Sequence, residues 1–167
     1  MVIGCCGSGK STFSTKLQTL TKLELFHLDQ YYWKPNWEES NKEEWKKTVQ
    51  ELANKFHWII DGNYSGTMDI RLEKADTVIY FDYPTWKCLW RVILRTFKYW
   101  HKQRPDMPSG CNERFDLAFL HYVATFNIIK RRRILEKLER LKSEKVVKII
   151  KTDFDASQYL DSLKYQN

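Results

Sequence analysis

The chain has 167 residues, of which 43% are hydrophobic and 15% aromatic, and its formal net charge is +7. This length and apolar content fit one α/β domain with a buried core, which excludes an intrinsically disordered chain and leaves little room for a second domain. Every long apolar stretch is interrupted by Lys or Arg, so we expect no membrane-spanning helix. The positive charge favours partners that carry phosphate, namely nucleotides, nucleic acid or anionic lipid, without choosing among them.

The four cysteines, Cys5, Cys6, Cys88 and Cys111, contain no C-x-x-C pair. Their spacing excludes a zinc ribbon, and we interpret all four as reduced thiols. Because the residues after Met1 lead directly into a glycine-rich loop, no signal peptide is visible. We therefore expect a cytoplasmic protein.

Short apolar segments alternate with helical patterns along the whole chain. This alternation of nearly continuous apolar strands with helices indicates a parallel sheet covered on both faces. The aromatic stretch 30–37 and the proline-containing stretch 104–111 are predicted to be loops. The predicted strands span 2–3, 23–28, 58–60, 77–81 and 146–150, and the predicted helices span 10–20, a segment from a capping box at 40–43 to about 55, 67–74, 85–103, 112–141 and 156–163.

A glycine-rich segment, GCCGSGKS, matches the pattern G-x-x-x-x-G-K-[ST] between the first strand and the first helix. Glycines in this context let backbone N–H groups turn inward around an anion, at the positive end of the helix dipole. We expect the Lys10 ammonium to bridge the β- and γ-phosphates of ATP and the Ser11 hydroxyl to bind Mg²⁺. The alternative is a chance glycine-rich turn. The predicted nucleotide-binding residues are Gly4, Gly7, Ser8, Gly9, Lys10, Ser11 and Thr12.

Three acidic residues, Asp29, Asp61 and Asp82, each follow a predicted strand. The carboxyl ends of parallel strands share one edge of a sheet, which is the edge where ligands bind. Asp61 is predicted to bind Mg²⁺, and Asp29 to contact either the Mg²⁺ shell or the hydroxyl of a phosphoryl acceptor. The alternative for each residue is a turn or a helix cap.

A basic stripe recurs at spacings of three or four along the helix predicted from Thr85. Such spacing places its members on one helix face, with Trp86, Trp90 and Phe97 among the residues of the apolar side. For its last two members the alternative is an ordinary solvated face. The stripe consists of Lys87, Arg91, Arg95, Lys98 and Lys102.

Further motifs accompany the phosphate loop: Tyr32-Trp33-Lys34-Pro35, Asp61-Gly62-Asn63-Tyr64, Arg104-Pro105-Asp106 and Glu113-Arg114-Phe115-Asp116. Together these segments resemble the DNA topology modulation (FlaR-like) proteins within the adenylate-kinase-like P-loop kinases, over nearly the whole chain. The resemblance implies one P-loop domain, residues 1–167, built as a three-layer α/β sandwich. Its five-stranded parallel sheet would have the order 2-3-1-4-5. It also implies an acceptor-side segment at about 30–57 and a mobile lid insert at about 100–134.

The resemblance also implies arginines that surround the ATP phosphates. Arg91 and Arg95 resemble the pair that begins the lid, and Arg131 and Arg133 fit an R-x-R pattern on its far side. Four guanidinium groups that converge on an empty site would repel one another, so the insert should be open without ligand. With Lys10 and Asp29, these four arginines form the predicted catalytic set.

Adenylate kinases carry D-G-F-P-R where this chain has DGNYS at residues 61–65, so the arginine that would hold an AMP phosphate is missing. An aromatic acceptor site of Tyr32, Trp33, Asn63 and Tyr64, together with Asp29, suits a neutral nucleoside or another hydroxylated small molecule. The alternative is that these rings fill the core.

The sequence therefore predicts a kinase that transfers the γ-phosphoryl group of Mg·ATP to a small acceptor. One alternative is an ATP-dependent DNA-binding regulator that acts through the basic stripe, and another is a simple ATPase. Because no known DNA-binding motif is present, DNA binding is expected to be weak and nonspecific. We expect a monomer or a homodimer.

Overall fold

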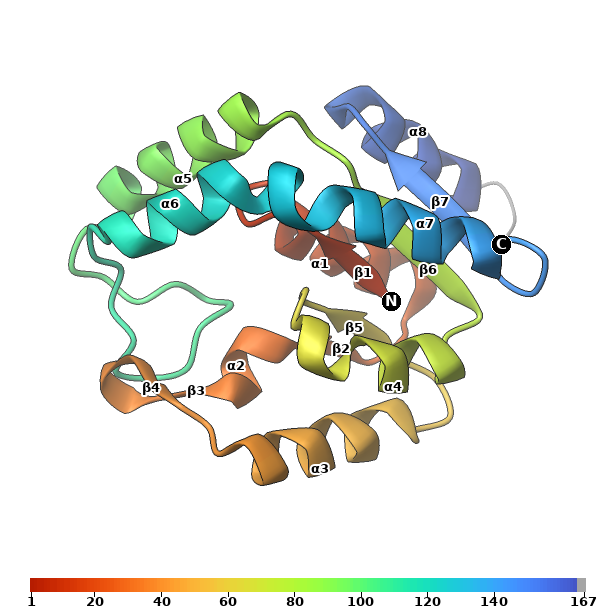
Figure 1. Ribbon diagram of the computed structural model, residues 1–167, viewed down its shortest axis with the longest axis horizontal. Coiled ribbons are helices and arrows are strands. Elements are labelled where there is room, and N and C mark those ends of the chain that lie inside the picture. The colour runs from red at the N-terminus through yellow and green to blue at the C-terminus, as the bar shows by residue number, and fades with distance from the viewer. Residues whose placement is uncertain (165–167) are drawn as a thin grey trace.

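The computed structural model describes residues 1–164 and has an α/β fold with a parallel sheet at its centre (Figure 1). Each strand is short and largely apolar, as expected for strands buried on both faces. The strands of this sheet are β1 (Val2–Gly4), β2 (Leu25–His27), β5 (Ile59–Asp61), β6 (Thr77–Phe81) and β7 (Val146–Ile150).

The sheet has the order β2-β5-β1-β6-β7, and all of its pairings are parallel. Counted in chain order, these five strands follow the predicted 2-3-1-4-5. The labels differ because β3 (Trp33–Lys34) and β4 (Glu38–Glu39) intervene as a separate antiparallel hairpin, which the sequence did not predict. The carboxyl ends of β1, β2 and β5 lie together at one edge, where the predicted site should form.

Helices cover both faces of the sheet. In Figure 1, α7 passes in front of the strands, α4 and α3 lie on their lower side, and α1 lies behind them, where it packs against α8. A π-helical turn, Asn127–Arg131, joins α6 to α7. The helices are α1 (Lys10–Thr21), α2 (Leu28–Tyr32), α3 (Lys42–Ala53), α4 (Met68–Lys74), α5 (Thr85–Lys98), α6 (Leu117–Phe126), α7 (Arg132–Leu141) and α8 (Asp153–Lys164), with 3₁₀ turns at Pro35–Trp37 and Ser65–Thr67.

Two helix starts differ from the sequence prediction. The capping box predicted at 40–43 is wrong, because the cap of α3 is Asn41, whose side chain accepts a hydrogen bond from the Glu43 N–H at 2.9 Å. Likewise, α6 begins at Leu117 and not near 112, since the Asp116 carboxylate caps it by accepting from the Phe119 N–H at 3.0 Å. Both caps satisfy a free N–H group of the first helical turn.

The helix from Thr85 ends at Lys98, five residues before the predicted end. The chain then pairs with itself through isolated β-bridges, Trp100 with Glu113 and Gln103 with Asn112. Backbone groups bonded in this way are not available to extend a helix. The insert between α5 and α6 is therefore a closed loop, and not two helices meeting at a tip.

The core has two parts. The larger part packs the strands against α1, α5–α8 and α4, and the smaller one packs Phe26, Leu28, Val49 and Ile60 between β2, β5 and α3. The aromatic ring of Trp45 on α3 joins this smaller part and also reaches the candidate site. Within residues 1–164, no helix combines the length and the apolarity that crossing a bilayer requires.

Candidate functional site

The phosphate loop lies between β1 and α1 and is pressed against β6 and α5. A Cβ atom added at Gly4 would lie 2.7 Å from the Phe81 carbonyl oxygen, and one added at Gly7 would lie 2.3 Å from the Cys88 carbonyl oxygen. Both glycines have positive φ angles, +144° and +80°, as does Gly9 at +92°. A side chain at Gly4 or Gly7 would therefore clash with the backbone, and Gly9 has a positive φ that glycine adopts most readily, so the loop depends on these glycines.

Lys10 begins α1 and is buried at the base of this loop. Its ammonium group donates a hydrogen bond to the Cys5 carbonyl oxygen at 3.0 Å. Although burial disfavours the charged form, the neighbouring Cys6 and Asp61 raise the pKa of Lys10, so the side chain stays a cation at neutral pH. Cys6, Lys10 and Ser11 line one cavity, which places a fixed positive charge where the loop would hold phosphates.

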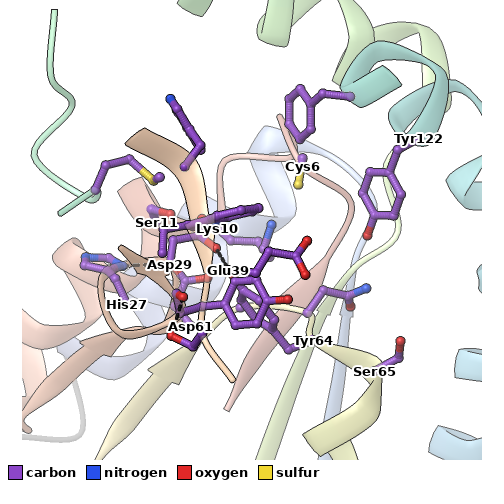
Figure 2. A pocket seen from close by; sticks show the side chains of 18 of the residues that line it. Cys6, Lys10, Ser11, His27, Asp29, Glu39, Asp61, Tyr64, Ser65 and Tyr122 are labelled. Carbon is purple, nitrogen blue, oxygen red and sulfur yellow. Dashed lines mark hydrogen bonds and ion pairs between the residues drawn. The ribbon is translucent and has the colours of Figure 1, made fainter. Parts of the chain in front are cut away.

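Asp61, at the end of β5, has one oxygen in use and one unsatisfied. Its Oδ2 lies 2.9 Å from His27 Nδ1, while its Oδ1 is buried with no hydrogen-bond partner among the described residues. Burial favours neutral imidazole, but the bond to Asp61 prevails and raises the pKa of His27. Asp61 and Ser11 line the same cavity (Figure 2), and their side-chain oxygens are of the hard type that Mg²⁺ prefers.

The described residues contain no ready-made cluster of three or more His, Cys, Asp or Glu side chains for a metal. Mg²⁺ typically keeps several waters and binds through one or two carboxylates together with substrate phosphates. The pair Ser11 and Asp61 fits that role, in which the ion arrives with the nucleotide.

The sequence predicted that Asp29 directly follows a strand. In the structure it lies in the first turn of α2. Its carboxylate points into the cavity near Lys10 and accepts a hydrogen bond from the Tyr64 hydroxyl at 2.5 Å (Figure 2). Burial raises the pKa of Asp29, although the bond from Tyr64 opposes that rise. A carboxylate with a raised pKa is a stronger base for an acceptor hydroxyl than an exposed one.

Arg71 fixes the loop that carries Asn63 and Tyr64. This guanidinium group is fully buried and donates to the carbonyl oxygens of Gly62 at 2.7 Å, Asn63 at 3.0 Å and Tyr64 at 3.1 Å. Burial lowers the pKa of Arg71 to about 10, which still leaves it charged at neutral pH. The loop holds Tyr64 at a positive φ of 22°, a backbone conformation that L-residues rarely adopt. Arg71 was not predicted as a site residue, and it acts here through the backbone that it holds.

A single cavity of about 810 Å³ connects the phosphate loop to an aromatic acceptor side. On that side the ring centroid of Tyr32 lies 4.7 Å from that of Tyr64 and 5.1 Å from that of Trp45. The predicted acceptor residues Tyr32, Trp33, Asn63 and Tyr64 all line the cavity. The cavity is also lined by residues that the sequence analysis did not place in the site: His27, Trp37, Glu39, Lys42, Trp45, Glu113, Phe119, Tyr122 and Lys130.

Of the predicted nucleotide-binding residues, Lys10 and Ser11 line the cavity and the other five do not. Ser8 is buried, and its hydroxyl has no hydrogen-bond partner among the described residues. Thr12 is exposed on α1.

The insert rests on the acceptor-side hairpin (Figure 1). The Gly110 carbonyl oxygen accepts from the Asn36 N–H at 3.1 Å, and the Trp37 indole donates to the Asn112 carbonyl oxygen at 3.0 Å. A third bond runs from the Gln30 amide to the Pro105 carbonyl oxygen at 3.0 Å. The insert is therefore docked in this structure, unlike the open insert expected without ligand, because these bonds tie it to α2 and to the 3₁₀ turn Pro35–Trp37.

The four predicted lid arginines do not converge on the site, and Arg95 alone among them lines the cavity. The mutual repulsion expected among them is absent, because carboxylates neutralise three of the four. The fourth, Arg133, is exposed on α7 and has no ion pair within residues 1–164. The pairs are Arg91 with Asp153 at 2.7 Å, Arg95 with Glu113 at 3.2 Å, and Arg131 with Asp82 at 2.6 Å.

The basic stripe of α5 is turned inward and its apolar side outward. Trp86, Trp90 and Phe97 are 69%, 57% and 71% exposed, whereas the side chains of Arg91 and Arg95 are 31% and 23% exposed. Arg91 also reaches the phosphate loop, donating to the Ser8 carbonyl oxygen at 3.4 Å. The first three cations of the stripe therefore face protein groups, which does not favour a DNA-binding surface there.

Comparison with known proteins identifies the fold. No protein-family model matches the chain, and no curated protein matches it. A deoxyadenosine kinase from M. mycoides, solved with dCMP and dCDP, is 13% identical with a TM-score of 0.50 over 99% of this chain and 96% of that chain. A sugar kinase from Janibacter sp. HTCC2649, solved without ligand, is 17% identical with a TM-score of 0.46 over 99% and 88% of the two chains. The likeness to the deoxyadenosine kinase shows that this chain shares the α/β fold of that protein.

Proposed function

We propose that this protein is a kinase that transfers the γ-phosphoryl group of Mg·ATP to a hydroxyl group of an uncharged, ring-bearing small molecule such as a nucleoside. The observation that carries the proposal is the single cavity that Lys10 and Ser11 of the phosphate loop line together with Asp29 and an aromatic acceptor side. The fold agrees with this function, and the site residues supply the chemistry.

The phosphate side supplies charge at fixed positions. Lys10 would pair with the β- and γ-phosphates, and the glycine-rich backbone would donate N–H groups to them. Ser11 and Asp61 would hold Mg²⁺, which would neutralise part of the phosphate charge. Because these groups are already positioned by packing, they need no reorganisation as charge develops on the leaving phosphate.

The acceptor side supplies a base. The acceptor oxygen attacks the γ-phosphorus, the bond from that phosphorus to the β–γ bridging oxygen breaks, and ADP leaves. Asp29 takes the hydroxyl proton, and Tyr64 holds the Asp29 carboxylate in place. The rings of Tyr32, Tyr64 and Trp45 pack against one another at tilted angles of 53° and 57° and form an apolar wall beside this carboxylate. Such a wall suits a ring of the acceptor.

The proposal specifies an uncharged acceptor because the Arg71 guanidinium group is already hydrogen-bonded to the protein backbone. Arg71 lies on α4, and its guanidinium group donates to three backbone carbonyl oxygens of the loop that follows β5. It is therefore not available to hold a phosphate on the acceptor. The nearby Glu39 and Lys42 bring opposite charges to the same wall, so the wall offers hydrogen bonds without a net charge.

A screen for acceptor-dependent ADP release tests this proposal. We expect nucleosides to accelerate ADP formation from Mg·ATP, and nucleoside monophosphates and open-chain polyols to have little effect. The same panel applied to Lys10→Ala controls for contaminating kinases. Stimulation by monophosphates alone would contradict the uncharged acceptor, and no stimulation by any compound would leave ATP hydrolysis as the activity.

The bond from Tyr64 to Asp29 predicts a pH effect. The Tyr64 hydroxyl stabilises the ionised carboxylate, so Tyr64→Phe should raise the pKa of Asp29 further. Since the base must be ionised to take a proton, the acidic limb of the profile of kcat/KM against pH should move to higher pH. Tyr99→Phe, outside the cavity lining, is the matched control. A limb that does not move in Tyr64→Phe would show that Asp29 is not the titrating base.

A further inference from the structure

Helix α5 presents a row of large apolar side chains to solvent. Trp86, Trp90 and Phe97 are more than half exposed, and Trp100, just beyond the end of the helix, is 46% exposed. The members of this row follow one another at spacings of four, three, four and three residues, the spacing of a seam between two packed helices. We call this row the α5 seam, and it consists of Trp86, Trp90, Ile93, Phe97 and Trp100.

A mostly apolar groove lies at the insert end of the seam. Its volume is about 180 Å³, and its apolar lining includes Ile93, Phe97, Trp100, Phe115 and Leu120. Phe115, which comes from the insert, is itself 55% exposed. An apolar cavity of about 150 Å³ is large enough to hold benzene. The groove therefore has room for one aromatic ring from outside.

The exposed aromatic area is large for a monomer. At about 200 Å² for each aromatic side chain, the exposed parts of Trp86, Trp90, Phe97, Trp100 and Phe115 amount to about 600 Å². The largest apolar patch on a typical monomer covers about 300–600 Å², and a stable interface buries about 800 Å² on each partner. These rings alone therefore supply most of the area that a stable interface needs.

The charge distribution favours a second copy of this chain over an anionic partner. Residues 130–151 contain ten Lys and Arg and three Asp and Glu, so this segment carries the whole formal net charge of +7. In Figure 1 its elements α7 and β7 lie to the right, away from α5 at the upper left. On α5 itself, Lys98 is the one cation without a carboxylate partner within residues 1–164. Two copies can therefore meet through α5 without strong repulsion, whereas an anionic membrane or nucleic acid would be attracted to the other side.

We propose that the α5 seam is the interface of a symmetric homodimer, in which α5 of a second copy packs antiparallel across it. The seam is nearly symmetric about Ile93, because Trp86 and Trp100 lie seven residues to either side of it, and Trp90 and Phe97 lie three and four. A two-fold axis near Ile93 brings Trp90 of each copy against Phe97 of the other, and Trp86 of each copy to the groove of the other. The dimer does not rest on the proposed kinase function.

Analytical ultracentrifugation of the full chain measures this association. We expect the wild-type protein to sediment as a dimer at micromolar concentration. Trp90→Glu should raise the dimer dissociation constant about tenfold or more, because the two-fold symmetry buries the new carboxylate twice against an aromatic ring. Phe56→Glu is the matched control and should leave the dissociation constant unchanged, since Phe56 is 92% exposed between α3 and β5, outside the seam.

A mixture of two variants tests the antiparallel arrangement. Phe97→Lys alone should also weaken the dimer, because it too buries an unpaired charge. When the Trp90→Glu and Phe97→Lys proteins are mixed, the mixed dimer should form more tightly than either variant associates with itself. In that dimer one crossing joins a carboxylate to an ammonium group, and the other keeps the wild-type contact between Trp90 and Phe97. A mixture that associates no better than its two components would overturn the antiparallel seam.

Two results would overturn the dimer itself. One is a wild-type protein that stays monomeric up to about 100 µM, and the other is a dimer that Trp90→Glu does not weaken. Co-sedimentation with vesicles of phosphatidylserine and phosphatidylcholine tests the rival occupant, since a monomer that binds them and loses binding in Trp90→Glu would assign the seam to a membrane. Circular dichroism checks that the variants are folded. If Trp90→Glu does not fold, Phe97→Lys decides by the same criterion.

Discussion

Replacing Lys10 with alanine should lower turnover by about 10³-fold, the upper part of the range seen when one charge-stabilising donor is lost. Lys10 is buried, its pKa is raised, and it is the cation at the base of the phosphate loop. Without it, the phosphates would lose a fixed positive charge in a site that excludes water, and Mg·ATP should bind more weakly as well. Initial rates and calorimetric titration of Mg·ATP measure the two effects separately.

The matched control is Lys16→Ala, since Lys16 is exposed on the same helix. It removes an equal formal charge, so any general effect of net charge on nucleotide binding appears in both variants. Equal Mg·ATP affinity and equal turnover in Lys10→Ala and Lys16→Ala would show that the loop does not bind phosphates in the predicted manner.

The second large effect is expected for Asp29→Asn, which should lower kcat about 10²-fold or more and leave the ATP dissociation constant nearly unchanged. The amide keeps the shape of the carboxylate and can still bond to Tyr64, but it cannot take the acceptor proton. Rapid-quench or steady-state rates give kcat, and calorimetry gives the affinity. Asp69→Asn, at an exposed position on α4, controls for loss of a carboxylate.

Near-normal kcat in Asp29→Asn would assign Asp29 a structural part only. A structural part of this kind is known for acidic residues in the first turn of a helix, because their charge stabilises the positive end of the helix dipole. In that case the bond from Tyr64 would serve to tie α2 to the loop after β5.

The parallel sheet could be predicted from sequence because its strands are local apolar runs. Both Thr77–Phe81 and Val146–Ile150 have the bounds that the apolar pattern indicated. The phosphate loop was equally predictable, since its shape depends on glycines within eight residues of one another. In both cases the determining interactions lie close together in the chain.

The acceptor side was less predictable because its geometry comes from contacts between distant segments. Asp29 lines the cavity, but it lies in a first helical turn and does not follow a strand directly, because a strand end and a first helical turn look alike in a short apolar segment. The hairpin at 33–39 is stabilised by the insert some 75 residues later, through the bond from Trp37 to Asn112. No local pattern contains that information.

The orientation of α5 could not be predicted from the sequence either. Its two faces were identified correctly, but an amphipathic pattern does not state which face meets the protein. Here the cationic face meets the carboxylates of Asp153 and Glu113. Their positions in α8 and in the insert could be known only from the fold.

The fate of the γ-phosphoryl group tests the central claim most directly. ATP labelled with ³²P at the γ-position is incubated with the protein, Mg²⁺ and a nucleoside mixture, and the products are separated by thin-layer chromatography. A kinase acting as proposed transfers the label to a nucleoside, in stoichiometric yield with ADP and with loss of transfer in Asp29→Asn. Label recovered only as inorganic phosphate, at a rate that nucleosides and Asp29→Asn do not change, would contradict the account.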